Sequence, residues 1–197
     1  MTEAPPRRIA AFVEDFAHRQ VIGPLIHRVA VECGAAVELD WRNARRGHGQ
    51  VVRELKDYLR DLTRQGGLPD LVVIGTDANC KGFVERRREL PIQDCPVPAV
   101  LAIPDPHIER WLLLDGAAFK AALGQGCRAP DRKCARDRYK EALMRAVLDA
   151  GITPSLGGIE FAEDIVRAMD LERAARDDAS LKHFLDDLRA AQRSLCP

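Results

Sequence analysis

Three short apolar runs, separated by segments with helical spacing, constrain the fold of this chain most strongly. The runs are residues 9–13 (IAAFV), 71–75 (LVVIG) and 100–103 (VLAI). Runs this short are typical of strands that are buried on both faces of a sheet. Val37, Leu39 and Trp41 alternate with small or charged residues and indicate a further half-buried or edge strand. Because helical segments separate the strands, the sequence predicts an α/β fold with a doubly wound parallel sheet.

Apolar residues at helical spacing mark the segments between and after the strands. One helix should end at Gly34, with Pro24 in its first turn or at a kink, and another should end at Gly66 and Gly67. Beyond residue 105 the expected helices cover residues 108–123, 137–150, 159–169 and 180–193. A chain of 197 residues suits one good-sized core. We therefore expect an α/β domain over residues 1–125, with residues 126–197 as a helical C-terminal extension packed on it.

Charge and hydropathy limit the class of protein. Thirty basic residues balance thirty acidic ones, so any site for a polyanion must be local. No apolar run approaches the roughly 20 residues that span a bilayer, and the amino-terminal MTEAPPRR lacks the apolar stretch of a signal peptide. We expect a cytoplasmic protein with no membrane partner.

The cysteines form no recognisable metal-binding or disulfide pattern. No two of them make a C-x-x-C pair, and the neighbourhood of Cys127 and Cys134 lacks the further ligands that zinc needs. Reduced thiols are therefore the expectation for all six, which are Cys33, Cys80, Cys95, Cys127, Cys134 and Cys196.

Polar residues follow two of the predicted strands. Glu14 comes directly after residues 9–13, and Asp77 and Asn79 come after residues 71–75. Parallel strands end at one rim of a sheet, which is where ligands bind in such folds. Carboxylate and amide oxygens suit Mg²⁺ or Mn²⁺, which could polarise a phosphodiester and its attacking water. The alternative is a simple turn, in which Asp77 and Asn79 bond to the nearby backbone.

Other ligand-binding loops are excluded. A calcium loop that began at Asp77 would place Lys81 and Arg88 at positions that require oxygen ligands. The chain also lacks the glycine-rich signatures of nucleotide-hydrolysing P-loops and of dinucleotide-binding folds.

The order of a Glu after the first strand and an Asp-x-Asn after a later one resembles the Toprim domain of topoisomerases, primases and OLD-family nucleases. More specifically, residues 108–115 (IERWLLLD) are similar to the I-E-x-W-L-L-x-D signature of small stand-alone bacterial Toprim-like proteins related to those nucleases. Residues 180–185 (SLKHFL) resemble their closing helix. The resemblance implies a Rossmann-like Toprim sheet flanked by helices.

The resemblance also implies functional residues. Glu14, Asp77 and Asn79 would be catalytic residues and ligands of Mg²⁺ or Mn²⁺. His18 would be a further ligand, at a position where the family usually has an acid. Asn79 replaces a common aspartate, which removes one negative charge from the site. Supporting acids would be Asp15, Glu109 and Asp115. His107 precedes an expected helix, so we interpret it as a cap of that helix rather than as a phosphate contact.

Basic residues near this rim are candidates for nucleic-acid binding. Residues 42–49 (RNARRGHG) have no apolar face and read either as a solvated loop or as a loop that touches phosphate. A solvated helix face is the alternative for the basic residues that follow Asp77. The candidates are Arg45, Arg46, Lys81, Arg86 and Arg87.

Three functional hypotheses remain open. The first is a metal-dependent nuclease, or a nuclease subunit, that cleaves DNA or RNA; by resemblance it implies phage defence or mobile-element biology and a partner ATPase. The second is a catalytically weak or inactive Toprim-like binding module that acts with such a protein partner. The third is a phosphatase or phosphotransfer enzyme for small molecules on the same sheet.

Overall fold

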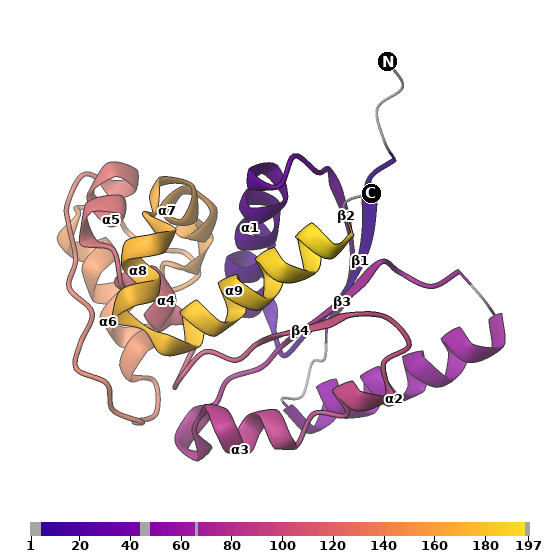
Figure 1. Ribbon diagram of the computed structural model, residues 1–197. Coiled ribbons are helices and arrows are strands. Elements are labelled where there is room, and N and C mark those ends of the chain that lie inside the picture. Colours follow the sequence, from indigo (N-terminus) through magenta and orange to yellow (C-terminus); the bar gives the residue numbers. More distant parts are fainter. Residues whose placement is uncertain (1–4, 44–47, 66, 196–197) are drawn as a thin grey trace.

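The computed structural model describes residues 5–43, 48–65 and 67–195. Its centre is a parallel four-stranded sheet in the order β2-β1-β3-β4 (Figure 1). The strands are β1 (Arg7–Val13), β2 (Val37–Asn43), β3 (Leu71–Gly75) and β4 (Ala99–Ala102). The predicted α/β class, the parallel pairing and the edge position of β2 are confirmed.

Alternate residues of the central strands pack into two separate cores. Ile9 and Val73 face the core that contains α1 (Phe16–Glu32), whereas Phe12 and Ile74 face the core under α2 (His48–Gln65). All five residues of β3 are buried, as a strand covered on both faces requires. Figure 1 shows α1 and α9 (Ala179–Ser194) on one side of the sheet and α2 on the other.

The carboxyl-terminal helices join the larger of these cores. Apolar residues of the later helices and of α1 belong to one buried cluster with β1, β3 and β4. Figure 1 shows a group of short helices beside α1. These elements are α4 (Glu109–Leu113), α5 (Gly116–Leu123), α6 (Arg138–Asp149), α7 (Ala162–Ala168) and α8 (Leu171–Asp177), while α3 (Phe83–Arg88) lies near α2.

One expectation about helices is wrong. Residues 108–123 form two helices, because the Asp115 side chain accepts hydrogen bonds from the backbone N–H groups of Ala117 and Ala118 and so begins α5. Of the two places expected for Pro24, the first turn is ruled out: Pro24 lies in the interior of α1, because the helix already begins at Phe16, where Asp15 is its N-cap. Among the described residues no helix has both the length and the apolar character needed to cross a membrane.

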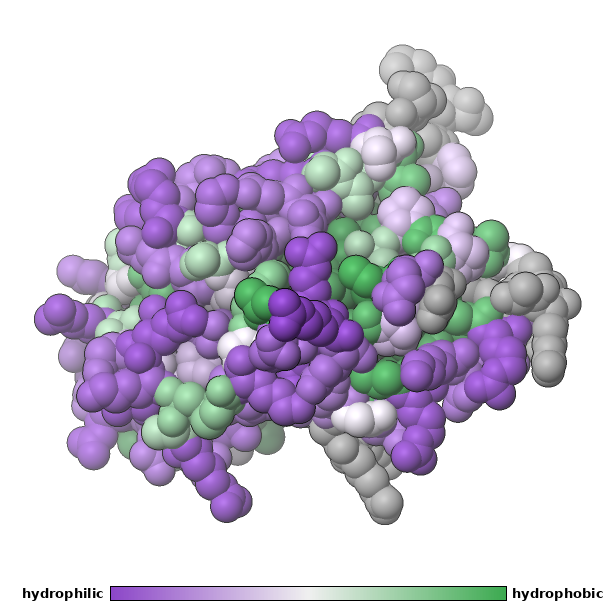
Figure 2. Space-filling model, turned by 60° about the horizontal axis from the view of Figure 1, so that its bottom comes forward, coloured by the Kyte–Doolittle hydropathy of each residue, from purple (hydrophilic) through white to green (hydrophobic). Residues whose placement is uncertain are grey.

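Most of the face that lies at the bottom of Figure 1 is hydrophilic. Figure 2 turns this face forward and shows hydrophilic side chains over most of it, with hydrophobic ones gathered in a central strip. The parallel strands end toward this part of the molecule.

Candidate active site at the carboxyl ends of β1 and β3

Glu14 and Asp77 lie side by side at the rim. Val13 pairs with Gly75 at the last position of the β1–β3 ladder, and Glu14 continues it by donating its N–H to the Gly75 carbonyl at 3.0 Å. Oε2 of Glu14 accepts hydrogen bonds from the Thr76 hydroxyl at 2.8 Å and from the Asp77 N–H at 3.1 Å. The structure thus brings the two predicted acids together, but Glu14 binds the backbone of Asp77 rather than sharing a ligand with it.

Asp77 is the centre of the site. Its Oδ1 accepts the Ile108 N–H at 2.9 Å, and its Oδ2 lies 3.0 Å from Nδ1 of His107. His18 Nε2 lies 3.2 Å from Oδ1, an ion-pair distance without the alignment of a hydrogen bond. Burial opposes ionisation, but the charge of His18 and the hydrogen bond from His107 together lower the pKa of Asp77. Asp77 is therefore a carboxylate between two imidazoles.

His18 connects Asp77 to Asp15. The His18 side chain is only 1 % exposed, and its Nδ1 lies 2.8 Å from Asp15 Oδ1. Burial alone would lower the pKa of His18, yet the adjacent Asp77 and Asp15 carboxylates raise it well above its ordinary value. In turn, although burial opposes the effect, the hydrogen bond and charge of His18 lower the pKa of Asp15 to about 2. The two carboxylates thus favour the protonated, imidazolium form of His18.

Glu109 is the acid at this rim with an unsatisfied oxygen. Glu109 is 4 % exposed, and its buried Oε2 has no hydrogen-bond partner among the described residues. Burial first, and the nearby charge of Asp77 second, raise the pKa of Glu109. Glu109 and His107 line one pocket of about 220 Å³, together with Lys140. The hydrogen bond to Asp77 raises the pKa of His107, against the opposing effect of burial.

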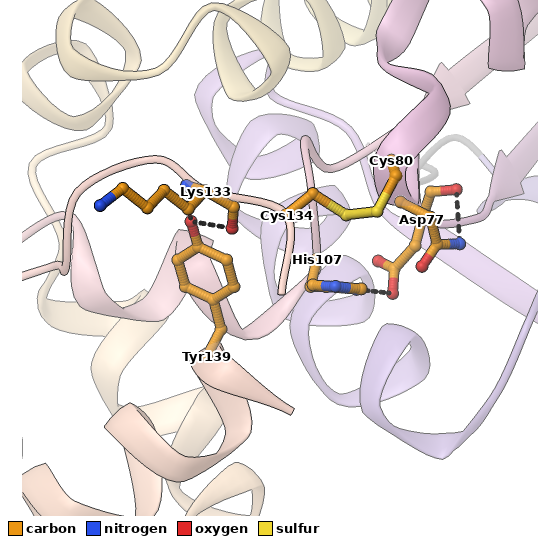
Figure 3. Close-up of a disulfide and its surroundings, with 7 residues drawn as sticks. Asp77, Cys80, His107, Lys133, Cys134 and Tyr139 are labelled. Carbon is orange, nitrogen blue, oxygen red and sulfur yellow. Dashed lines mark hydrogen bonds and ion pairs between the residues drawn. A yellow bond between two sulfur atoms is a disulfide. The ribbon is translucent and has the colours of Figure 1, made fainter. Parts of the chain in front are cut away.

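A disulfide lies on the wall of this pocket. Cys80, next to Asn79, is bonded to Cys134, so the expectation of reduced thiols is wrong for this pair. Figure 3 shows the disulfide beside His107, whose ring points to Asp77. Spacing could not reveal the bond, because 54 residues separate the two cysteines and only the tertiary fold brings their Cα atoms to 5.3 Å.

The Tyr139 hydroxyl fixes the chain next to Cys134. The hydroxyl accepts a hydrogen bond from the Lys133 N–H at 3.1 Å and lies 3.2 Å from the Lys133 carbonyl. Together with the disulfide, this anchor holds the segment of residues 126–137 against the pocket.

A second group of polar residues supports the rim from the side of α2. His48 lies 3.2 Å from the Thr76 hydroxyl through Nδ1 and 3.1 Å from Glu89 through Nε2. Burial first, and then the charge of Arg86, lower the pKa of His48, against the effect of Glu89. Sequence reasoning missed His48 and Glu89 as parts of the site. It also favoured a structural cap for His107, because no spacing rule connects a residue after β4 to Asp77.

The basic residues predicted to contact phosphate differ in their burial and in their ion pairs. Arg86 is buried rather than solvated: its Nε donates to the Asp77 carbonyl at 2.8 Å and its Nη1 lies 2.8 Å from Glu89. Lys81 is also paired with Glu89, whereas Arg87 is exposed. The predictions for Arg45 and Arg46 lie outside the described residues.

Two predicted site residues have local roles. Asn79 donates from its side chain to the Asp77 carbonyl at 3.5 Å and has a positive φ of 52°, as a tight turn requires. Asp115 is buried, and besides capping α5 it accepts the Asp170 N–H at 2.9 Å and pairs with Arg173 at 2.6 Å. The bonds of Asp115 therefore hold α8 to α5.

The residues as arranged do not fit a divalent cation. Within the described ranges, no group of three or more His, Cys, Asp or Glu side chains is placed to hold a metal ion. Both oxygens of Asp77 already face protein partners, and the imidazolium of His18 supplies positive charge beside it. A hard cation would have to displace these partners and tolerate the charge of His18. Binding of Mg²⁺ or Mn²⁺ stays a prediction.

The arrangement is instead suited to proton transfer. Asp77 orients one nitrogen of His107, and Glu109 lines the same pocket with an unpartnered oxygen.

Comparison with protein-family models, with curated proteins and with solved structures gives no match to this chain.

Proposed function

We propose that this protein hydrolyses phosphodiester bonds of nucleic acid, with Glu109 as general base and His107 as general acid. One observation carries the proposal: these two groups share a pocket, and the pKa of each is raised. A raised pKa makes a carboxylate a stronger base. For an imidazole, a raised pKa means that the protonated form persists to higher pH. Both shifts suit proton transfer in water.

The reaction follows from these roles. The Glu109 carboxylate takes a proton from a water molecule, and the water oxygen forms a bond to phosphorus. As the bond from phosphorus to the leaving oxygen breaks, the second ring nitrogen of His107 gives its proton to that oxygen. The hydrogen bond from Nδ1 to Asp77 fixes the ring so that Nε2 is the nitrogen available for transfer. Asp77 and Glu14 act as positioning residues.

Local positive charge supports a phosphate substrate. Residues 128–140 contain six basic and two acidic residues, and the disulfide holds this segment at the pocket. Arg136 and Lys140 line the pocket itself. Lys140 is also close enough for its charge to act on the carboxyl groups of Asp15 and Glu109. Such charges would attract a phosphate and offset the charge that develops on it.

The test is cleavage of single-stranded DNA, duplex DNA and RNA by the wild type, His107→Asn and Glu109→Gln. The exposed Glu141 on the adjacent α6 offers a matched control, Glu141→Gln. We expect wild-type and control cleavage, with losses of about 10²- to 10⁴-fold in the two site variants. Each reaction is run with a chelator and then with Mg²⁺ or Mn²⁺. Cleavage that strictly needs the metal would overturn the acid–base assignment and favour the predicted metal site.

A second candidate is a Toprim-like module that binds nucleic acid or a protein partner without cleavage. The observation that favours it is the arrangement of Asp77, whose oxygens are both engaged within the protein. It predicts binding of nucleic acid with no product under any metal condition, and equal binding by wild type and Glu109→Gln. A partner ATPase stays a prediction.

A further inference from the structure

A separate open pocket of about 420 Å³ runs along α1, away from the catalytic pocket. One stripe of α1 lines it at helical spacing, from Arg19 through Gly23 to Arg28. Trp41 of the edge strand β2 forms the facing wall, and Arg167 of α7 lines it as well. From residue 19 to residue 28 the helix rises by about 14 Å, which is enough for a short piece of extended polymer.

An aromatic ring and a cation are packed together in this pocket. A Cβ atom on Gly23 would lie 3.1 Å from Cζ2 of Trp41, so the glycine lets the indole approach the helix closely. The guanidinium carbon of Arg19 lies 5.3 Å from the centre of the Trp41 ring. Arg19 forms no ion pair with any carboxylate in the described part of the chain, so its charge is available to a ligand.

Positive charge in the pocket is only partly neutralised. Arg28 donates through Nη1 to the carbonyls of Val166 and Met169, at 2.5 and 2.6 Å. These bonds fix the Arg28 guanidinium against α7 without cancelling its charge. By contrast, the charge of Arg167 is balanced by Glu163 and Asp164. Within the described residues, two guanidinium groups of the pocket thus have no carboxylate partner, and together with one indole they match a phosphate and a flat ring.

Along the chain, residues of this pocket adjoin residues of the catalytic rim. Arg19 directly follows His18, the residue that bridges Asp15 and Asp77. Trp41 pairs with Ala11 in the sheet, two positions before the end of β1. A polymer with its scissile phosphate near Asp77 could therefore continue along α1 into the pocket.

We propose that this pocket binds nucleotides of a single-stranded nucleic acid, with a base against Trp41 and phosphates at Arg19 and Arg28. The strand is single because a base can stack on a side chain only when its faces are free of a duplex stack. The assignment deepens the proposed function, since it names single strands as the substrate class.

Tryptophan fluorescence tests the proposal without cleavage. The chain has two tryptophans, and Trp111 is 1 % exposed, so a change on binding reports Trp41. We expect a ten-nucleotide oligothymidylate to quench the emission of Glu109→Gln protein, in which cleavage is blocked. Duplex DNA of the same length should quench much less. Absence of quenching by the single strand, or equal quenching by the duplex, would overturn the proposal.

Charge and ring variants make the test specific. Affinity for a fluorescently labelled oligothymidylate, measured by anisotropy at fixed salt, should fall about tenfold in Trp41→Leu and in Arg19→Gln. Trp41→Phe keeps a ring and should retain most of the affinity, which separates stacking from loss of fold. The control is Arg53→Gln, because Arg53 is exposed on α2, on the other face of the sheet. Equal losses in Arg19→Gln and Arg53→Gln would mean unspecific attraction and would overturn the site.

The two proposals fail in different ways. Quenching by single strands without cleavage by the wild type would keep this pocket and reject the hydrolase. Cleavage with unchanged affinity and KM in Trp41→Leu and Arg19→Gln would keep the hydrolase and reject the pocket.

Discussion

His18 Nε2 lies 3.2 Å from Asp77 Oδ1, while the other nitrogen of the same ring lies 2.8 Å from Asp15. One buried histidine thus bridges two carboxylates at the carboxyl ends of the strands. His18 lies in the first turns of α1, so this helix supplies the positive charge between the two carboxylates.

Replacement of His18 should destabilise the fold in a pH-dependent way. The pKa of His18 is raised, so its stabilising charge is fully present below the ordinary value of 6.5 and is lost as pH rises through the raised pKa. His18→Gln leaves Asp77 without this partner, and we expect a loss of about 3 kcal/mol near pH 6. Thermal unfolding of both proteins between pH 6 and 10 checks this: the difference in Tm should shrink toward alkaline pH. His27→Gln, at an exposed position of the same helix, is the control. A constant difference would contradict the charged state.

The rate of hydrolysis should depend on pH through both catalytic groups. His107 must be protonated to act as an acid, so the rate should fall as pH rises through its raised pKa. Glu109 must be ionised to act as a base, so the rate should also fall as pH drops through its raised pKa. We expect a bell-shaped profile for the wild type. Asp77→Asn should move the alkaline limb to lower pH, because the carboxylate that raises the pKa of His107 is gone. An unmoved limb would remove His107 from the acid role.

Glu109→Gln should stabilise the protein while it slows hydrolysis. Ionised Glu109 has a buried oxygen without a hydrogen bond, and its raised pKa means that ionisation opposes folding above about the ordinary value of 4.5. We expect a gain of roughly 1 kcal/mol at pH 7, or about 2–4 °C in Tm, and no gain near pH 4. Differential scanning calorimetry at the two pH values measures this. A loss of stability at pH 7 would mean that Glu109 has a structural partner.

Reduction of the Cys80–Cys134 disulfide should lower stability and loosen the basic segment. The bond closes a loop across 54 residues, and the loop-entropy relation gives about 4 kcal/mol for that length. Urea unfolding with and without a reductant measures the loss, and the Cys80→Ser/Cys134→Ser double variant should match the reduced wild type. Hydrogen exchange should rise in residues 126–137 before it rises in the strands. If the reductant destabilises the double variant equally, another effect is responsible.

Local patterns in the sequence predicted much of the fold. Runs such as residues 71–75 are buried on both faces, and this requirement is met by a parallel sheet with helices on both sides. The alternation of Val37, Leu39 and Trp41 likewise predicted an edge strand. The break at Asp115 was missed, because capping by a single side chain competes with an apolar pattern that continues on both sides of it.

The site was only partly accessible to such reasoning. Strand order by itself placed Glu14 and Asp77 on one rim, since Glu14 directly follows β1 and Asp77 comes two residues after the parallel strand β3. No local pattern specifies that His18 and His107 both face Asp77, or that Cys80 meets Cys134, because these contacts join segments that are distant in the chain. The sequence by itself determined the sheet and the acids at its rim. Only the tertiary structure decided which groups pair with those acids, and pairing and burial, rather than residue type, set their charge.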